Sequence, residues 1–172
     1  WARDQLGMQL DKAAILQGIV ALGIAGGAIL AARFVPLKQT PSVLKLGVIM
    51  GLVVPGMTLV SSMGASIPLL VIIGGLAGYF VVPMNALLQH RGHVLLSAGH
   101  SIAVQNFNEN LNILVMLGLY ALLIKLELHV NTIIIIFGLF VAGTMALVIR
   151  RYRHNRRHYD LDALIGVEKH HH

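Results

Sequence analysis

Charge, aromatic side chains and cysteine are what the 172-residue sequence has least of. No cysteine is present, which excludes disulfide bonds and thiolate metal sites. Only 12% of the residues are charged, whereas an average soluble domain has about 25%. Aromatic residues make up 6% and are not interleaved with the basic ones, as they are on surfaces that stack nucleic-acid bases. A nucleic-acid partner is therefore not expected, although the net charge is +6.

Apolar residues, by contrast, make up 56% of the chain and come in long blocks. A helix needs about 20 such residues to cross a bilayer. Five blocks are long enough, and a soluble domain of this length could not bury all of them in one core. We therefore predict an all-α integral membrane protein, because helices satisfy their own backbone hydrogen bonds in lipid. The five predicted spans run over residues 13–32, 42–60, 67–88, 94–124 and 130–149, with approximate bounds.

The connections between these blocks alternate in charge. The loop after the first span carries Arg33, Lys38 and Lys45, the next loop carries no charge, and the third carries Arg91. Basic loops mark the cytoplasmic side of a membrane, so the first span is expected to enter from outside and the C-terminal tail to be cytoplasmic. A basic cluster directly follows the last span and leads into that tail, where it would meet anionic lipid headgroups. The cluster consists of Arg150, Arg151, Arg153, Arg156 and Arg157.

The sequence suggests two regions. Residues 1–153 are predicted to form the membrane bundle, and residues 154–172 a basic cytoplasmic tail. The three histidines at the end of that tail resemble the remnant of a purification tag. Residues 1–7 read like the end of a preceding segment, so a fragment of a longer chain is expected.

Small residues and prolines within the blocks predict how the spans pack. Glycines four residues apart let helix backbones approach closely in lipid. Such pairs occur at Gly23 and Gly27, at Gly47 and Gly51, and at Gly74 and Gly78. Pro55 and Pro83 are expected to bend their helices, because proline removes a backbone donor and crowds the preceding turn.

The block at 94–124 differs from the others in having many polar residues. At about 100° per residue, six of them fall on one face about 120° wide, and apolar residues such as Phe107 and Leu111 lie opposite. The six are Ser97, Ser101, Gln105, Asn108, Glu109 and Asn112. Polar groups at this depth need partners or water, so the face is expected to meet other protein or an aqueous cavity.

Glu109 is the only acidic residue inside a predicted span. It lies roughly 22 Å along its helix, near the middle of the bilayer. A carboxylate there can contact a substrate headgroup, hold a coupling ion or proton, or pair with a gating cation. It can equally hydrogen-bond to a neighbouring helix and only hold the bundle together. Asn85 and Gln89, which are four residues apart, are candidates to extend the polar surface.

Groups for catalysis or metal binding are missing from the sequence. His90 and His93 are expected in a loop without an acidic partner, and His100 is a single histidine. No nucleophile motif, phosphate-binding glycine loop or carboxylate pair is present. We therefore expect that the protein is not an enzyme, that it has no catalytic residues, and that it uses neither a cofactor nor a metal.

Two segments resemble the bacterial lysophospholipid transporter family, which belongs to the major facilitator superfamily. They read GYFVVPMNALLQHRG at 78–92 and SAGHSIAVQNFNEN at 97–110. The resemblance implies the C-terminal six-helix bundle of a major facilitator fold. Residues 1–7 would be the end of helix seven, and the five spans would be helices eight to twelve.

The same resemblance implies a gating loop after the first span. Gly27, Leu30 and Arg33 fit the superfamily's cytoplasmic loop motif. Ala32 stands where that motif has an acidic residue, so the match is partial.

The family moves lysophospholipids, such as lysophosphatidylethanolamine, from the outer to the inner leaflet of the bacterial inner membrane. An acyltransferase–synthetase partner re-acylates them there. The resemblance thus implies a lysophospholipid substrate and alternating access, in which this bundle works with a missing N-terminal half. The expected pathway residues are Gln105, Asn108, Glu109 and Asn112, with Ser101, Asn85 and Gln89 towards the cytoplasmic end.

Two other functions remain open from the residues. Another facilitator carrier, for a drug, sugar or organic anion, would have an enclosed hydrophilic cavity. A non-transporting membrane scaffold for lipid enzymes would bury the polar face against other helices. A hydrophobic cavity with a lateral opening to the lipid would favour the lysophospholipid carrier.

Overall fold

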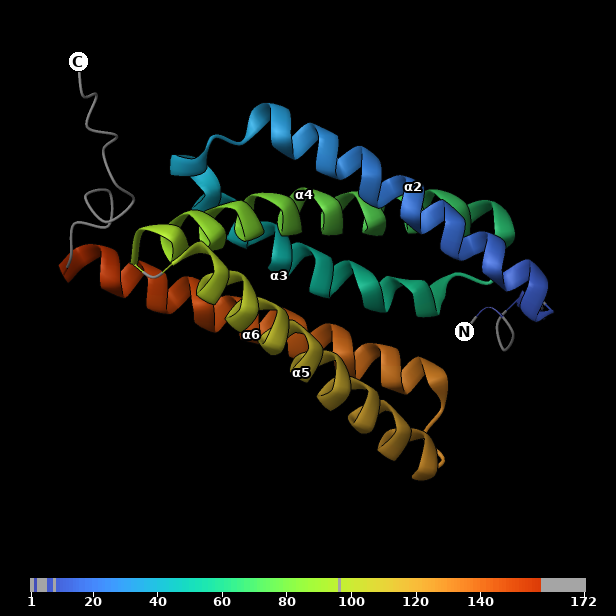
Figure 1. Cartoon of the computed structure of the whole chain (residues 1–172). Coiled ribbons are helices and arrows are strands. Elements are labelled where there is room, and N and C mark those ends of the chain that lie inside the picture. Colours follow the sequence, from blue (N-terminus) through green and yellow to red (C-terminus); the bar gives the residue numbers. More distant parts are fainter. Residues whose placement is uncertain (1, 3–5, 8, 96, 159–172) are drawn as a thin grey trace, which may run out of the picture.

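The computed structural model describes residues 2, 6–7, 9–95 and 97–158 (Figure 1). Over these residues the chain is helical, and no strand is found. The elements in chain order are α2 (Leu10–Phe34), η1 (Leu37–Val43), α3 (Leu44–Val53), η2 (Val54–Leu59), α4 (Met63–Leu95), α5 (Ala98–Lys125) and α6 (Val130–His158).

Five segments are long and apolar enough to cross a membrane, which confirms the predicted all-α membrane class. They run over Ala13–Phe34, Gln39–Leu59, Met63–Gly92, Gly99–Lys125 and Val130–Asn155.

The second span is not one continuous α-helix. It joins η1, α3 and η2, and the change from α3 to η2 comes directly before Pro55. Proline has no N–H group and crowds the preceding turn, so it favours the end of an α-helix at this point. Pro83 lies instead within α4, where the α-helix is not interrupted.

Two segments predicted as loops are helical instead. His90 and Arg91 lie in the last turns of α4, which continues to Leu95. Residues 27–33 lie within α2, so the expected gating loop at Gly27 to Arg33 is wrong as a loop, in agreement with the predicted span of about 13–32. For α4, the sequence prediction ended the helix where the apolar residues end. Gln and Arg are good helix formers, however, and a helix can continue into the headgroup region, which brings the bilayer to about 40–45 Å.

The predicted division of the chain into a membrane bundle and a tail remains a prediction. α6 continues to His158, so the predicted boundary at 153 lies within this helix. Most of residues 1–7, predicted as the end of a preceding helix, and residues 159–172 of the predicted tail lie outside the described residues.

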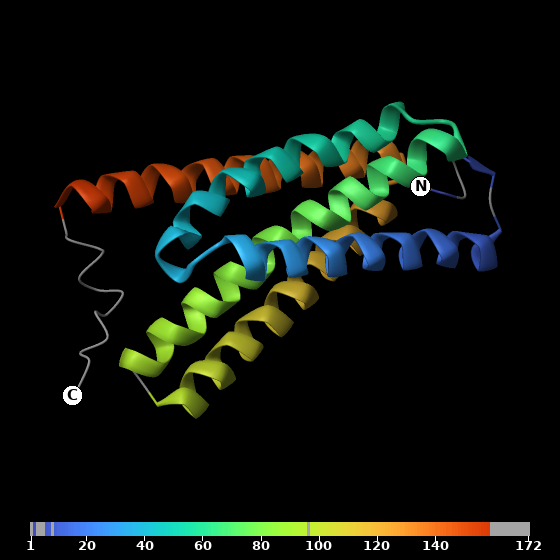
Figure 2. The ribbon, with the colours of Figure 1, turned by 90° about the horizontal axis from the view of Figure 1, so that it is seen from above.

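The close packing of α2 on α4 depends on glycines, as predicted. The two helices cross at an angle, and their backbones meet near the middle of each helix (Figures 1 and 2). A Cβ atom on Gly23 would come within 2.6 Å of the Val71 carbonyl oxygen, and one on Gly27 would collide with the backbone of Gly75. Any larger residue at these positions would therefore force the two helices apart.

α3 packs on α6 in the same way. A Cβ atom on Gly51 would meet the Gly138 carbonyl oxygen at 2.8 Å, and one on Gly47 would meet Met145 Cγ at 2.8 Å. Gly138 in turn accommodates the ring of Pro55. Cβ atoms on Gly74 and Gly78 would likewise meet the α2 backbone at Val20 and Ile24. All three predicted glycine pairs thus lie at helix–helix contacts, so this packing prediction is confirmed.

α5 is the long helix that is least covered by other described parts of the chain. It begins beside the end of α4 and then runs away from it, and α6 returns from its far end (Figures 1 and 2). Beyond Gln105 none of its residues is buried. This exposed helix is the one that carries the polar face.

Candidate functional site

The polar face of α5 begins with a helix cap. Ser97 is the N-cap, and its Oγ accepts a hydrogen bond from the His100 backbone N–H at 3.5 Å. The same Oγ lies 2.7 Å from His100 Nδ1. A serine at this position satisfies one of the N–H groups that the first turn leaves unpaired. The presence of Ser97 and His100 at this position is therefore explained by the N-terminal cap of α5.

Ser101 and Gln105 are the two buried members of the face, each with 9% of its surface exposed. Ser101 faces α4, because a Cβ atom on Gly92 would overlap its side chain. Gln105 lies one turn further along the same side. The small residues Gly92 and Ser101 thus allow α5 to cross α4 at short distance.

Gln105 connects the buried part of the face to Glu109. Its Nε2 donates a hydrogen bond to Glu109 Oε1 at 3.1 Å. Its own Oε1 is buried and has no hydrogen-bond partner among the described residues. A buried acceptor without a partner costs about 1–3 kcal/mol. The pair therefore presents a buried amide oxygen without a donor next to an exposed carboxylate that already accepts one hydrogen bond from Gln105.

Neither of the two pockets lined by described residues includes the remaining predicted pathway residues. Asn108, Glu109 and Asn112 are exposed along α5. Asn85 is half-buried and Gln89 exposed on α4. Among the described side chains, no hydrogen bond joins the α4 residues to the α5 residues. Their assignment to a substrate pathway remains a prediction.

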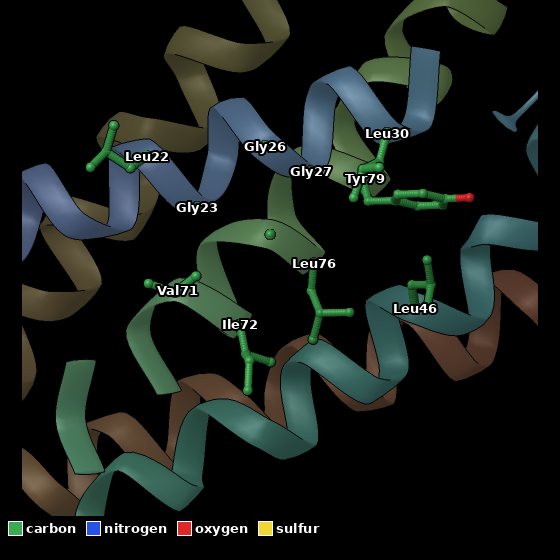
Figure 3. Close-up of a pocket in the computed structure, with 11 residues that line it drawn as sticks. Leu22, Gly23, Gly26, Gly27, Leu30, Leu46, Val71, Ile72, Leu76 and Tyr79 are labelled. Carbon is green, nitrogen blue, oxygen red and sulfur yellow. The ribbon is translucent and has the colours of Figure 1, made fainter. Parts of the chain in front are cut away.

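A large apolar groove lies elsewhere, between α2, α3 and α4 (Figure 3). It has a volume of about 600 Å³ and is open on one side. Its lining consists of Leu22, Gly23, Gly26, Gly27, Leu30, Leu46, Val71, Ile72, Gly75, Leu76 and Tyr79. The Tyr79 side chain extends from α4 into the gap between α2 and α3, and its hydroxyl is the one polar side-chain group in this lining (Figure 3).

This groove was not predicted from the sequence, although the glycine spacing in α2 indicates it. Gly26 lies between the packing glycines 23 and 27, and a Cβ atom there would meet nothing within 4 Å. Three glycines within five residues leave a helix wall without side chains. Gly27, predicted to belong to a gating motif, both lines this groove and contacts α4, whereas Arg33 is exposed near the end of α2.

Comparison with known proteins gives one clear relationship. Over 112 residues, or 65% of this chain, the sequence is 52% identical to "Lysophospholipid transporter LplT" of Yersinia pestis (strain Pestoides F). The same identity and coverage are found with LplT of Yersinia pseudotuberculosis serotype O:3 (strain YPIII). The chain is homologous to lysophospholipid transporters. The predicted resemblance is thereby confirmed.

The relationship with LplT covers part of each protein. The matched residues are 28% of the relatives' length, so the chain spans less than a third of the curated proteins it matches. No family model matches the sequence, and no solved structure matches it. The LplT relatives are named as transporters and not as enzymes, which agrees with the prediction of a non-enzyme.

Proposed function

We propose that this chain forms the C-terminal part of a lysophospholipid transporter of the major facilitator type. The complete protein would move lysophospholipids from the outer to the inner leaflet of the bacterial inner membrane. An acyltransferase–synthetase partner would re-acylate them there. The observation that carries this proposal is the 52% identity to LplT proteins over 112 residues. The alternating charge of the loops supports a cytoplasmic C-terminus.

The acceptors on α5 support a role in headgroup binding. Glu109 Oε1 is hydrogen-bonded to Gln105, and Gln105 Oε1 is the buried acceptor without a partner. A lysophosphatidylethanolamine headgroup has an ammonium and a glycerol hydroxyl, both of which donate hydrogen bonds. In a site shielded from water, such a donor would remove the cost of the unpaired amide oxygen and neutralise the carboxylate.

The apolar groove suits contact with membrane lipid. An enclosed hydrophilic cavity would be expected for a sugar or organic-anion carrier. The groove between α2, α3 and α4 is instead almost wholly apolar and open on one side. It lies away from the polar face of α5, so we assign headgroup contact to α5 and only lateral contact with lipid to the groove.

A non-transporting scaffold is the alternative from another functional class. It would bury the polar face of α5 against other helices. In this chain Asn108, Glu109 and Asn112 are exposed. In the complete protein, neighbouring helices would enclose them as a cavity. Transport by rocking of two halves would then expose this cavity to each side of the membrane in turn.

Uptake of lysophosphatidylethanolamine by the full-length protein in liposomes tests the proposal. The Glu109→Gln variant keeps the size of the side chain and removes its charge. We expect uptake to fall roughly tenfold or more, because a hydrogen bond to a charged group contributes about 1.5–3 kcal/mol. Glu127→Gln is the matched control, since Glu127 is exposed in the turn after α5 and should leave uptake unchanged.

Two results would count against the proposal at different levels. If the unaltered protein takes up no lysophospholipid, the assigned substrate is wrong. If the wild type is active and Glu109→Gln is equally active, no charge is needed at Glu109 and the pathway must be placed elsewhere.

A further inference from the structure

A second pocket lies between α3 and α6 and has a different chemistry from the apolar groove. Its volume is about 480 Å³. Its lining consists of Val48, Ala146, Ile149, Arg150, Arg153 and His154. One half of the lining is apolar and the other half is basic. None of these six side chains is acidic, so the described lining of the pocket carries a net positive charge.

Helix geometry explains why some of the basic residues of α6 line the pocket and others do not. Ala146, Arg150 and Arg153 follow one another at intervals of four and three residues, which places them on one face of α6. Ile149 and His154 lie on either side of this row and complete the arc that lines the pocket, whereas Arg151 lies about 60° beyond His154 and does not line it. Neighbouring arginines of one cluster therefore have different surroundings.

The position of the pocket along α6 favours a ligand that is partly apolar. Arg150 directly follows the apolar stretch that begins at Val130, so the pocket lies where the membrane span meets the headgroup region. Val48 and Ala146 line its membrane side, and Arg153 lies about 10 Å further along α6 than Ala146. A free phosphate would use only the basic end. A phospholipid would place its phosphate at the arginines and the start of its acyl chains against the apolar half.

We propose that this pocket binds the headgroup of an anionic phospholipid of the surrounding membrane. Arg150 and Arg153 hold the phosphate, and the glycerol and first methylene groups lie against Val48 and Ala146. Basic pockets between membrane helices are suited to such headgroups. On the orientation predicted from the loop charges, the lipid belongs to the cytoplasmic leaflet. The site is separate from the proposed transport pathway on α5, and the lipid is held rather than moved.

Lipid binding to the full-length protein in a neutral detergent tests this proposal. The purified protein is stripped of lipid and titrated with phosphatidylglycerol, with phosphatidylcholine of the same chain length, and with inorganic phosphate alone. Bound lipid is counted by native mass spectrometry. We expect phosphatidylglycerol to bind more tightly than phosphatidylcholine. Arg150→Gln and Arg153→Gln should each weaken phosphatidylglycerol binding about fivefold.

The cluster itself provides a control with the same change of charge. Arg151→Gln also removes one positive charge, but from outside the pocket, and should leave binding within about twofold of the wild type. All three arginines are exposed, so the substitutions should not disturb packing, and equal melting temperatures without lipid would verify this. Val48→Phe is a further variant that fills the apolar half and keeps every charge. It should also weaken lipid binding.

Three results would overturn the proposal. Equal losses for all three arginine variants would mean diffuse attraction to the whole cluster. Equal binding of phosphatidylcholine and phosphatidylglycerol would mean that the arginines do not select the headgroup. If inorganic phosphate alone displaced phosphatidylglycerol at similar concentrations, the pocket would be a simple anion site.

Discussion

At the scale of single residues, Gly26 and Gly27 are adjacent in sequence but have different roles. A Cβ atom on Gly27 would collide with backbone atoms of Gly75, which cannot move unless α2 and α4 separate. A Cβ atom on Gly26 would meet nothing within 4 Å, because Gly26 faces the open groove. The spacing of glycines in the sequence predicted that Gly27 packs against another helix. That Gly26 faces open space could not be predicted, because it depends on where the neighbouring helices lie.

We expect Gly27→Ala to lower the free energy of unfolding by about 1–3 kcal/mol, the usual cost of overpacking. Gly26→Ala should change it by less than about 0.5 kcal/mol, as a substitution into open space does. Unfolding in mixed micelles of increasing denaturing detergent, followed by circular dichroism, measures both. Equal effects of the two substitutions would contradict the close approach of α2 to Gly75.

At the scale of elements, the sequence predicted the existence and order of the helices better than their ends. Apolar blocks reveal the spans, because lipid imposes a minimum apolar length. The ends depend on local helix formation, so Gln89 and Arg91 extend α4 where hydropathy predicted a loop. The polar face of α5 was also predictable from spacing. What covers that face was not, because it depends on contacts that α5 makes with elements distant in sequence.

The contact between α4 and the start of α5 leads to a prediction about the local stability of α5. The contact is close at Gly92, where a Cβ atom would overlap the Ser101 side chain, including its Cβ. Gly92→Ala should therefore push the start of α5 away from α4. We expect faster amide hydrogen exchange over residues 98–105, measured by mass spectrometry in detergent, because loss of packing lowers the local opening free energy.

Gly99→Ala serves as the control for that measurement. Gly99 lies in the first turn of α5, and a Cβ atom there would meet nothing within 4 Å. Exchange over the same residues should stay as in the wild type. If Gly92→Ala also left exchange unchanged, Gly92 and Ser101 would not be what holds the two helices together.

At the scale of the whole molecule, the direction in which the bundle crosses the membrane decides which leaflet each site faces. The η1 segment lies among basic residues, and the connection around Ser62 carries no charge. The positive-inside rule therefore predicts that Gln39 is cytoplasmic and that Ser62 is outside. It also places the pocket at Arg150 and Arg153 in the cytoplasmic leaflet.

Because the chain has no cysteine, single substitutions can test this orientation directly. Both Ser62 and Gln39 are exposed, so a thiol at either position is open to reagents on its own side of the membrane. In intact cells that express a full-length protein without other cysteines, a membrane-impermeant maleimide should label Ser62→Cys. It should label Gln39→Cys only after the membrane is permeabilised. The reverse pattern would invert the bundle and move the phospholipid pocket to the outer leaflet. Labelling of both positions in intact cells would contradict a single orientation.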